Sequence, residues 1–327
     1  MTAGPTLRTV CGVVGTCSAA AAALGVAAHF AGPVSTTVAL TASFTPLFVI
    51  LAGVSAVLLV AARWRRAAIA VLVVVLVGVG SQLPLFIGES PESGVAPTIT
   101  VLQANIRLGE ADPHALVDLV RGGGVEVLTV SELTEPAVAK LAAAGVGRAL
   151  PFSYLYPRRG GGGAGIYSRH PLTDTRELPG LQHTNLRASL RVPGAAPVAV
   201  YALHPLPPYP EPSWRWALEL ERIGAVLAAE PQPIVVGADV NSTYDHQRYR
   251  ALLRESTRDG EDLVDAAEHL GAGIVATYPA DRWFPAVLAI DKILARGAVP
   301  VSLRRVELPG SDHHGVMGEV RLPPAPS

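Results

Sequence analysis

The first 88 residues contain three long apolar stretches, which constrain the fold more than any other feature of the chain. The stretches run roughly through residues 9–30, 38–62 and 67–87. A helix needs about 20 apolar residues to cross a bilayer, and each stretch is long enough. None of them has a polar face, which excludes the usual pattern of a helix that covers a soluble core. The sequence therefore predicts a membrane anchor of three transmembrane helices.

The first stretch also fits a second interpretation. It is rich in Ala and Gly, and Arg8 precedes it, as a basic residue precedes the apolar region of a signal peptide. Its length, and the two stronger stretches that follow it, favour a transmembrane helix.

Arginine placement predicts the orientation of these helices. Arg63, Arg65 and Arg66 lie in the short loop between the second and third stretches. Positively charged loops stay in the cytoplasm, and Arg8 then falls on the same side. The third helix would leave the membrane outward near residue 88. We therefore expect a multi-pass protein of the cell membrane with an extracytoplasmic domain.

Ionisable side chains such as His, Asp, Glu, Lys and Arg are nearly absent from within the apolar stretches. His29 is the only one, whereas transport pathways through membranes are marked by buried charges. The helices are therefore expected to anchor the protein to membrane lipid and not to form a pump or channel. We divide the chain into the anchor (residues 1–88), a linker (89–97), a catalytic domain (98–322) and a tail (323–327).

The region after the anchor and linker is mildly acidic. It carries 22 basic and 25 acidic residues, a net charge of −3. Tight binding of nucleic acid independent of its sequence normally draws on a basic surface, so this balance counts against a dedicated DNA-degrading enzyme. Both cysteines, Cys11 and Cys17, lie in the first apolar stretch, which excludes a thiol nucleophile in the catalytic domain.

Beyond Thr98 the pattern alternates between short apolar strands and a smaller number of helices. Many strands with few helices indicate an α/β fold in which sheets pack face to face with helices outside. The strands are expected over residues 98–103, 125–130, 165–168, 186–192, 198–203, 234–238, 289–294, 299–307 and 316–322, and the helices over 113–122, 136–144 and 213–229.

Acids, amides and histidines follow many of these strands. Strand ends in α/β folds gather at one edge of the sheet, where sites form. The number of polar residues at these strand ends is larger than helix and turn capping explains. Carboxylates suit a hard cation, and a carboxylate beside a histidine suits hydrolysis of a phosphate ester. The candidate residues are Asn105, Glu132, His204, Asp239, Asn241, Asp291, Asp312 and His313.

At these residues the chain resembles the endonuclease/exonuclease/phosphatase superfamily. That superfamily includes DNase I-like nucleases, abasic-site endonucleases, inositol polyphosphate phosphatases and neutral sphingomyelinases. The matching segments are LQANI, VSEL, GIYSRHP, LHP, GADVNS, AIDKIL and SDHH, and they occur in the family's order along nearly the whole domain. The resemblance implies a four-layer α/β sandwich of two packed, mainly antiparallel sheets flanked by helices.

The resemblance also implies a metal-dependent hydrolase. Mg²⁺, or Mn²⁺ in its place, would be held by Glu132 with Asn105 and Asp312 nearby. Water would attack phosphorus in line, without a covalent intermediate.

The remaining roles are implied by the same resemblance. Asp239 would position the attacking water, and Asn241 and His204 would stabilise the phosphoryl oxygens. Asp291 would pair with His313, which would act as a base or as a phosphate contact.

One position departs from the family pattern. The family usually has Gly directly before the Asp that corresponds to Asp239, and here that residue is Ala238, with Gly237 one position earlier. We expect Ala238 to be tolerated if its φ is negative.

A Pro-rich loop at residues 205–212 could shape a substrate pocket. Tyr209, Trp214 and Trp216 are candidates for its wall, although at least one Trp is expected to pack into the core instead. The same loop is a candidate for contact with lipid headgroups. Further candidate phosphate contacts are Arg158, Arg159 and Arg187.

Three functional hypotheses remain open from the sequence. The first is a phosphodiesterase or phosphatase that acts on a lipid headgroup, a small molecule or a phosphoester of the cell envelope. The second is an extracytoplasmic nuclease, which would need a basic groove. The third is a non-catalytic envelope binding protein, which would be expected to have lost site residues. No protein partner can be inferred.

Overall fold

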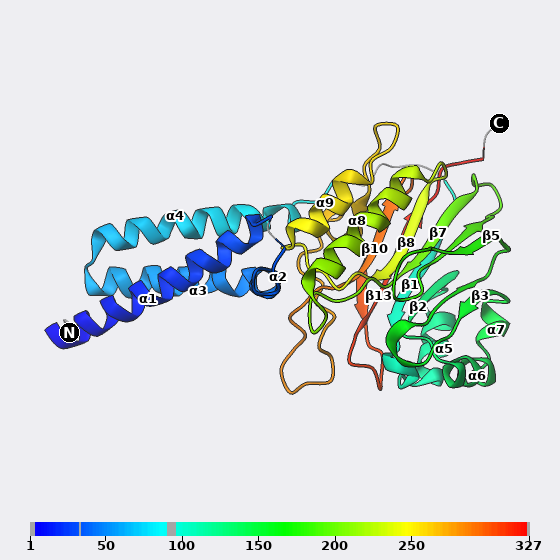
Figure 1. Ribbon diagram of the computed structural model, residues 1–327, viewed down its shortest axis with the longest axis horizontal. Coiled ribbons are helices and arrows are strands. Elements are labelled where there is room, and N and C mark those ends of the chain that lie inside the picture. Colours follow the sequence, from blue (N-terminus) through cyan, green and yellow to red (C-terminus); the bar gives the residue numbers. More distant parts are fainter. Residues whose placement is uncertain (1–3, 33, 90–95, 326–327) are drawn as a thin grey trace.

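A computed structural model describes residues 4–32, 34–89 and 96–325. Its N-terminal part is a bundle of helices that projects from an α/β domain (Figure 1). The segments Pro5–Phe30, Thr45–Ala62 and Arg65–Leu85 are each long and apolar enough to cross a membrane. The bundle helices are α1 (Pro5–Phe30), α2 (Thr36–Ser43), α3 (Thr45–Ala62) and α4 (Arg65–Gln82), followed by the short 3₁₀ helix η1 (Leu83–Leu85).

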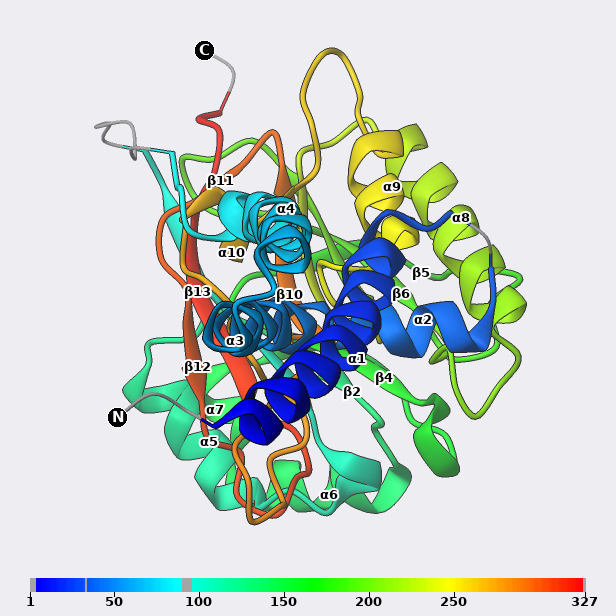
Figure 2. The same ribbon diagram turned by 90° about the vertical axis from the view of Figure 1, so that its left-hand side faces the viewer.

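The second predicted span, residues 38–62, is divided into two helices. The break lies at Phe44, whose φ of −110° and ψ of 16° are not helical. Pro46 stands in the first turn of α3, where its missing N–H leaves no hydrogen bond unmade. The short helix α2 therefore turns aside at the end of the bundle nearest the domain (Figures 1 and 2).

The first sheet is mixed and has the strand order β11-β13-β1-β2-β4-β3, with β12 also paired to β13. Only β1 and β2 pair in parallel, and the other pairs are antiparallel. Its strands are β1 (Thr98–Asn105), β2 (Val127–Ser131), β3 (Phe152–Tyr156), β4 (Ala164–Ser168), β11 (Val299–Pro300), β12 (Arg304–Val306) and β13 (Gly315–Arg321).

The second sheet is also mixed and has the order β5-β6-β7-β8-β10-β9. Here β7 and β8 pair in parallel, and the remaining pairs are antiparallel. Its strands are β5 (Leu172–Glu177), β6 (Leu186–Leu190), β7 (Val198–Leu203), β8 (Ile234–Asp239), β9 (Val264–Asp265) and β10 (Asp291–Arg296).

The two sheets pack face to face and helices cover their outer faces, so the predicted fold class is confirmed. Inward-facing residues such as Val101, Val200 and Val235 form the core between the sheets. Two further clusters lie beneath the helices on the outer faces. The covering helices are α5 (Pro113–Gly122), α6 (Glu135–Ala144) and α7 (Val146–Ala149) on the first sheet, and α8 (Ser213–Ala229) and α9 (Gln247–Glu255) on the second.

The structure contains elements that the sequence pattern did not predict. The edge strands β3 and β5 have mostly exposed or half-buried residues, so they lack an apolar alternation. The strand predicted over residues 299–307 is two short strands, β11 and β12, which pair separately with β13.

The helix α2 belongs to the hydrophobic core of the domain and not only to the bundle. Ala39 is buried in the cluster beneath α8 and α9, together with Trp216 and Tyr249. The Nε2 atom of His246 lies 3.0 Å from the Ala39 carbonyl oxygen and 3.3 Å from Ser43 Oγ. The anchor and the domain therefore share a packed boundary.

Two other bundle helices end on one carboxylate of the domain. Asp245 is buried, and its Oδ1 lies 2.7 Å from His29 Nδ1 at the end of α1. The same Oδ1 accepts a hydrogen bond of 2.7 Å from Gln82 Nε2 at the end of α4. Arg250 on α9 also donates to the His29 carbonyl oxygen. The single ionisable residue of the apolar stretches thus joins the bundle to the domain.

A second junction lies beyond α4. Gly273 N donates to the Leu85 carbonyl oxygen at 2.7 Å, and Glu89 N donates to the His269 carbonyl oxygen at 2.8 Å. His269 ends the short helix α10 (Ala266–His269). The bundle therefore also contacts the domain through η1 and the residues that follow it.

Candidate active site

The centre of the candidate site lies where the two sheets bring their strand ends together. Asn105 ends β1, and Glu132 directly follows the parallel neighbour β2. Asn105 Nδ2 donates to Glu132 Oε1 at 3.2 Å and to Asp239 Oδ2 at 2.9 Å. Since Asp239 ends β8 of the second sheet, Asn105 joins polar groups from both sheets.

Two site residues have backbone conformations that L-residues rarely adopt. Glu132 has a φ of 61° and Asn241 has a φ of 49°. Such conformations cost about 1–3 kcal/mol each and persist where the surrounding structure imposes them. Glu132 is held by the Leu108 N–H, which donates to its Oε2 at 3.0 Å. The positive φ values place both side chains at the cleft instead of continuing the strands.

Burial raises the pKa of the Glu132 carboxyl group. The hydrogen bond from Asn105 opposes this shift, and the negative charge of Asp239 adds to it. The raised pKa means that the isolated site disfavours negative charge on Glu132. A bound cation would reverse that preference, because it stabilises the charged carboxylate.

Besides Asn105, groups from three other segments surround Asp239. Its Oδ1 accepts a hydrogen bond of 3.0 Å from the Asn241 backbone N–H. Its Oδ2 lies 3.6 Å from His204 Nε2 and 3.8 Å from His313 Nε2. The antiparallel register of β8 and β10 places Asp291 directly opposite Asp239. The carboxylate of Asp239 is therefore the meeting point of the site.

Asp291 and His313 form a buried pair. His313 Nδ1 lies 2.8 Å from Asp291 Oδ2, and the two residues are 5% and 2% exposed. Burial alone would lower the pKa of His313, but the carboxylates of Asp291 and Asp239 outweigh it and raise the pKa to about 10. His313 is therefore a cation at neutral pH, with its Nε2 directed at Asp239.

His204 is in the opposite electrostatic state. It is 4% exposed, and burial lowers its pKa despite the nearby charge of Asp239. Its backbone N–H donates to Asn185 Oδ1 at 2.7 Å, which fixes the chain at the end of β7. The site thus combines one cationic and one neutral histidine on either side of Asp239.

The site residues open onto one cleft. The cleft is lined by six of the eight candidates, namely Glu132, His204, Asp239, Asn241, Asp312 and His313. Asn105 and Asp291 are 0% and 2% exposed and lie behind this lining. All eight are therefore close together, although Asp312 contributes to the cleft from a separate turn, with its carbonyl oxygen accepting from Ala280 N.

Two sets of groups have the chemistry of a divalent-cation site. The set predicted from sequence is Glu132 with Asn105 and Asp312, and two of its members line the cleft. In a second set, Asp239, Asp291 and His313, ligand atoms lie within 4.8 Å of one another. Among the described residues, Asp291 Oδ1 is buried without a hydrogen-bond partner. Carboxylate oxygens of this kind fit a hard cation.

Several residues at the cleft were missed by the sequence reasoning. The His183 ring lies 4.7 Å from the His204 ring, and the Tyr278 ring lies 4.8 Å from the His313 ring. Both stand in loops that follow no apolar strand, so the strand-end pattern gave no signal for them. Leu40 and Ser43 of α2 also line the cleft, although they are distant in sequence from every motif.

The three aromatic residues in and just after the Pro-rich loop lie in different environments. Tyr209 lines the cleft, whereas Trp216 is buried and donates from Nε1 to Ser242 Oγ at 3.0 Å. Trp214 is 60% exposed. At least one Trp therefore packs into the core, as expected.

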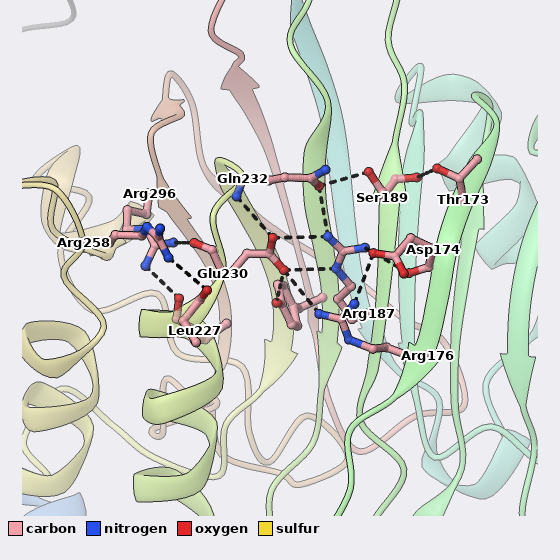
Figure 3. Close-up of polar contacts among 12 residues, drawn as sticks. Thr173, Asp174, Arg176, Arg187, Ser189, Leu227, Glu230, Gln232, Arg258 and Arg296 are labelled. Carbon is pink, nitrogen blue, oxygen red and sulfur yellow. Dashed lines mark hydrogen bonds and ion pairs between the residues drawn. The ribbon is translucent and has the colours of Figure 1, made fainter.

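Arg187, a candidate phosphate contact, has a structural position instead. It is buried on the outer face of the second sheet beside Tyr201, where its Nε lies 3.1 Å from Glu230 Oε2 (Figure 3). Its Nη1 contacts Asp174. The sequence could not distinguish this buried ion pair from a substrate contact.

The Ala residue that departs from the family pattern is accommodated. Ala238 is buried in β8, and it is not among the residues with positive φ. The close approach occurs one position earlier, where a Cβ on Gly237 would lie 2.1 Å from Thr129 Oγ1. Asp239 therefore keeps its place at the end of the strand.

Comparisons with known proteins give a family and a fold. The model of the Endonuclease/Exonuclease/phosphatase family matches residues 102–313. No curated protein matches the chain.

Solved structures share the fold at low sequence identity. A humanized TDP2 of D. rerio is 16% identical with a TM-score of 0.56, and the match covers 68% of this chain and 99% of that one. D. rerio TDP2 complexed with a single-strand DNA product is 16% identical with a TM-score of 0.55, and the match again covers 68% of this chain and 99% of that one. An endonuclease/exonuclease/phosphatase from Beutenbergia cavernae DSM 12333 is 19% identical with a TM-score of 0.51, and the match covers 70% of this chain and 72% of that one.

Proposed function

Because the chain belongs to the endonuclease/exonuclease/phosphatase family, we propose that it is a membrane-anchored, metal-dependent phosphoesterase. It would hydrolyse a phosphodiester or phosphomonoester by in-line attack of an activated water. The observation that carries this proposal is that His204 and His313 approach Asp239 in one cleft, while Asn105 behind it donates to both Asp239 and Glu132.

The roles follow from the charges of the groups that face the cleft. Asp239 accepts hydrogen bonds only and can orient the attacking water and receive its proton. His313, held as a cation by Asp291, would contact a phosphoryl oxygen or donate a proton to the leaving group. His204 and Asn241 would contact the remaining phosphoryl oxygens. Asn241 retains one amide N–H for this role, because the other reaches the Pro205 carbonyl oxygen.

A divalent cation completes the chemistry of the site. Mg²⁺, with Mn²⁺ as a substitute, would be held by Glu132, Asn105 and Asp312, and it would neutralise charge that develops on the phosphoryl oxygens. Asn105 would orient Glu132 and Asp239 toward one another through its two amide hydrogen bonds. Tyr278 would limit the movement of the His313 ring.

The anchoring and topology rest on the three N-terminal helices. Arg8, Arg63, Arg65 and Arg66 lie at the end of the bundle away from the domain, where the chain begins and where α3 turns into α4 (Figure 1). The positive-inside rule supports a cytoplasmic position for that end, which puts the catalytic domain outside the cell membrane.

The test uses the full-length protein in detergent micelles with bis-p-nitrophenyl phosphate and p-nitrophenyl phosphate. Turnover is measured with Mg²⁺, with Mn²⁺ and with EDTA, for the wild type and for Glu132→Ala and His313→Ala. Glu221→Ala and His114→Ala serve as matched controls, because both residues are exposed and lie outside the cleft. We expect turnover that depends on metal and falls by at least about 100-fold in the two site variants only.

Two results would count against the proposal. The first is turnover that EDTA leaves unchanged. The second is a folded protein in which Glu132→Ala and His313→Ala behave as their controls do. A single-stranded oligonucleotide included in the same assay tests the nuclease hypothesis, which predicts cleavage of the oligonucleotide in preference to the chromogenic esters.

A further inference from the structure

One wall of the catalytic cleft is built by the bundle and not by the domain. Leu40 and Ser43 of α2 line the cleft together with Asp239 and His313. The helix α2 connects α1 to α3, two helices that are long and apolar enough to cross a membrane. The cleft therefore opens beside the end of the bundle.

The position of this wall is fixed by hydrogen bonds that follow the catalytic motif. The segment after Asn241 continues directly to Asp245 and His246, which bind the ends of α1 and α4 and the helix α2. Thr243 N in turn donates to His246 Nδ1 at 2.9 Å. One short loop thus carries catalytic residues at its start and the attachment of the bundle at its end.

The depth of the cleft relative to the bundle follows from these contacts. His29 belongs to the last turn of α1, and Gln82 is the last residue of α4. Polar residues at the ends of spanning helices lie at the boundary between lipid and water. Since both reach Asp245, six residues beyond Asp239, the reacting groups lie next to that boundary.

The surroundings of the cleft are apolar on the side of the bundle. Leu40 is 39% exposed, and Leu288 and Ile290 line the cleft near it. Tyr209, from the Pro-rich loop, lines the cleft as well and is 62% exposed. The charged and hydrogen-bonding groups already described line the same cleft. A cleft lined by both apolar and polar side chains matches an amphiphile.

A second aromatic loop extends from the cleft. It begins after Tyr278, which lines the cleft, and it runs to β10 along the side of the domain that faces the bundle (orange in Figure 1). It carries Trp283, which is 96% exposed, and Phe284, whose ring packs against Trp283. Trp and Tyr are the side chains that membrane interfaces favour.

From these observations we infer that the substrate is a lipid-borne phosphoester whose headgroup enters the cleft from the bilayer alongside α2. This inference rests on the proposed phosphoesterase function and specifies its substrate class. The acyl portion stays in the bilayer that surrounds the bundle, and Leu40 contacts the part of the lipid adjoining the phosphate. A nucleic-acid strand or a small soluble ester has no acyl chain to leave in the bilayer beside this wall.

The test compares two esters that share one reacting group. Hexadecyl p-nitrophenyl phosphate resides in the bilayer, whereas ethyl p-nitrophenyl phosphate is soluble, and both release p-nitrophenol. The full-length protein is reconstituted in phosphatidylcholine vesicles with Mg²⁺ or Mn²⁺. The measured quantity is the ratio of turnover on the hexadecyl ester to turnover on the ethyl ester.

The decisive comparison is between two variants in the same vesicles, so that partitioning of the ester cancels. Leu40→Gln replaces the apolar wall with a polar side chain of similar size. Val299→Gln makes the same kind of change at a residue of β11 with comparable exposure, 37%, far from the cleft. We expect the ratio to fall on the order of tenfold in Leu40→Gln and to stay at the wild-type value in Val299→Gln.

The outcomes separate this inference from the proposed function. Metal-dependent turnover of the ethyl ester with none of the hexadecyl ester would overturn the lipid substrate and leave the phosphoesterase in place. Equal ratios in Leu40→Gln and the wild type would also overturn it. Absence of turnover on both esters would remove the proposed function and the inference together.

Discussion

Replacing Arg187 by Leu should destabilise the domain far more than an arginine substitution normally does. Arg187 is 2% exposed, and its Nε and Nη2 lie 3.1 and 3.2 Å from the two carboxylate oxygens of Glu230 (Figure 3). In Arg187→Leu the Glu230 carboxylate remains buried, with the Tyr201 hydroxyl and the Gln232 N–H as hydrogen-bond donors and the half-exposed Arg176 guanidinium as its ion-pair partner at 3.6 Å. Removing one partner of a buried ion pair costs about 3–5 kcal/mol.

A matched control is available on the adjacent strand. The Arg176 guanidinium lies 3.6 Å from the same carboxylate of Glu230, but its side chain is 46% exposed. Exposed ion pairs contribute about 0–1 kcal/mol, so Arg176→Leu should have a small effect. The two variants share charge, residue type and the Glu230 partner, whereas Arg187 differs in being buried and in the further hydrogen bonds that it donates to Asp174 and Gln232.

The difference in free energy translates into a measurable difference in thermal midpoint. For a domain of this size, 1 kcal/mol corresponds to about 2–4 °C. Arg187→Leu should therefore lower the midpoint by roughly 6–20 °C, and Arg176→Leu by less than about 4 °C. The assay is thermal unfolding of the full-length protein in micelles, followed by circular dichroism.

The loss of stability in Arg187→Leu should also depend on pH in a defined direction. Burial alone would raise the pKa of Glu230, but hydrogen bonds from Arg187 and Tyr201 outweigh it and lower the pKa. A lowered pKa contributes stability that is present above the unfolded pKa and is lost as pH falls through the folded pKa. In Arg187→Leu the buried carboxylate instead gains stability by taking up a proton. The difference in free energy of unfolding between the wild type and Arg187→Leu should therefore become smaller in acid.

Two results would refute this reasoning. One is equal midpoints for Arg187→Leu and Arg176→Leu. The other is a double variant, Arg187→Leu with Glu230→Leu, that is no more stable than Arg187→Leu alone, because removing the stranded carboxylate should recover much of the loss.

Three further predictions concern the site and its support. Asp291→Asn removes a carboxylate that raises the pKa of His313, so the loss of activity at high pH should move to lower pH. Turnover should also fall about 100-fold. A pH profile of activity that does not move would exclude His313 as the protonated group. Saturating Mg²⁺, at about 100 times its Kd, should stabilise the wild type by about 2.7 kcal/mol in thermal unfolding, and an equal gain in Glu132→Gln would place the cation elsewhere. Gly237→Ala should cost about 1–3 kcal/mol, because its Cβ would meet Thr129 Oγ1 at 2.1 Å, whereas Gly122→Ala, with open space around it, should leave the thermal midpoint nearly unchanged.

The polar strand ends were predictable because they depend on local pattern. Residues 198–203 and 234–238 are continuous apolar runs, so His204 and Asp239 could be placed at the ends of buried strands before their partners were known. Parallel pairing of these strands then sets both residues at the same edge. The packing of the two sheets against each other was predicted from the family resemblance.

The bundle's share in the site was not predictable, because it depends on contacts between distant segments. His29 appeared in the sequence as an isolated residue at the end of an apolar stretch, and its partner Asp245 lies 216 positions away. Leu40 was assigned to a transmembrane span, whereas the break at Phe44 sets it apart in α2. Neither the composition nor the periodicity of a sequence indicates such contacts between distant segments.

The shared attachment of α1 and α4 to Asp245 has a kinetic consequence. With the helices in a bilayer, the reacting groups cannot rise or tilt away from the surface as they would on a long flexible tether. A lipid substrate, as inferred above, would then meet the protein by lateral diffusion in two dimensions, and the rate would depend on the mole fraction of substrate in the leaflet. Diluting the substrate with inert lipid should slow the reaction, whereas diluting the vesicles in buffer should not.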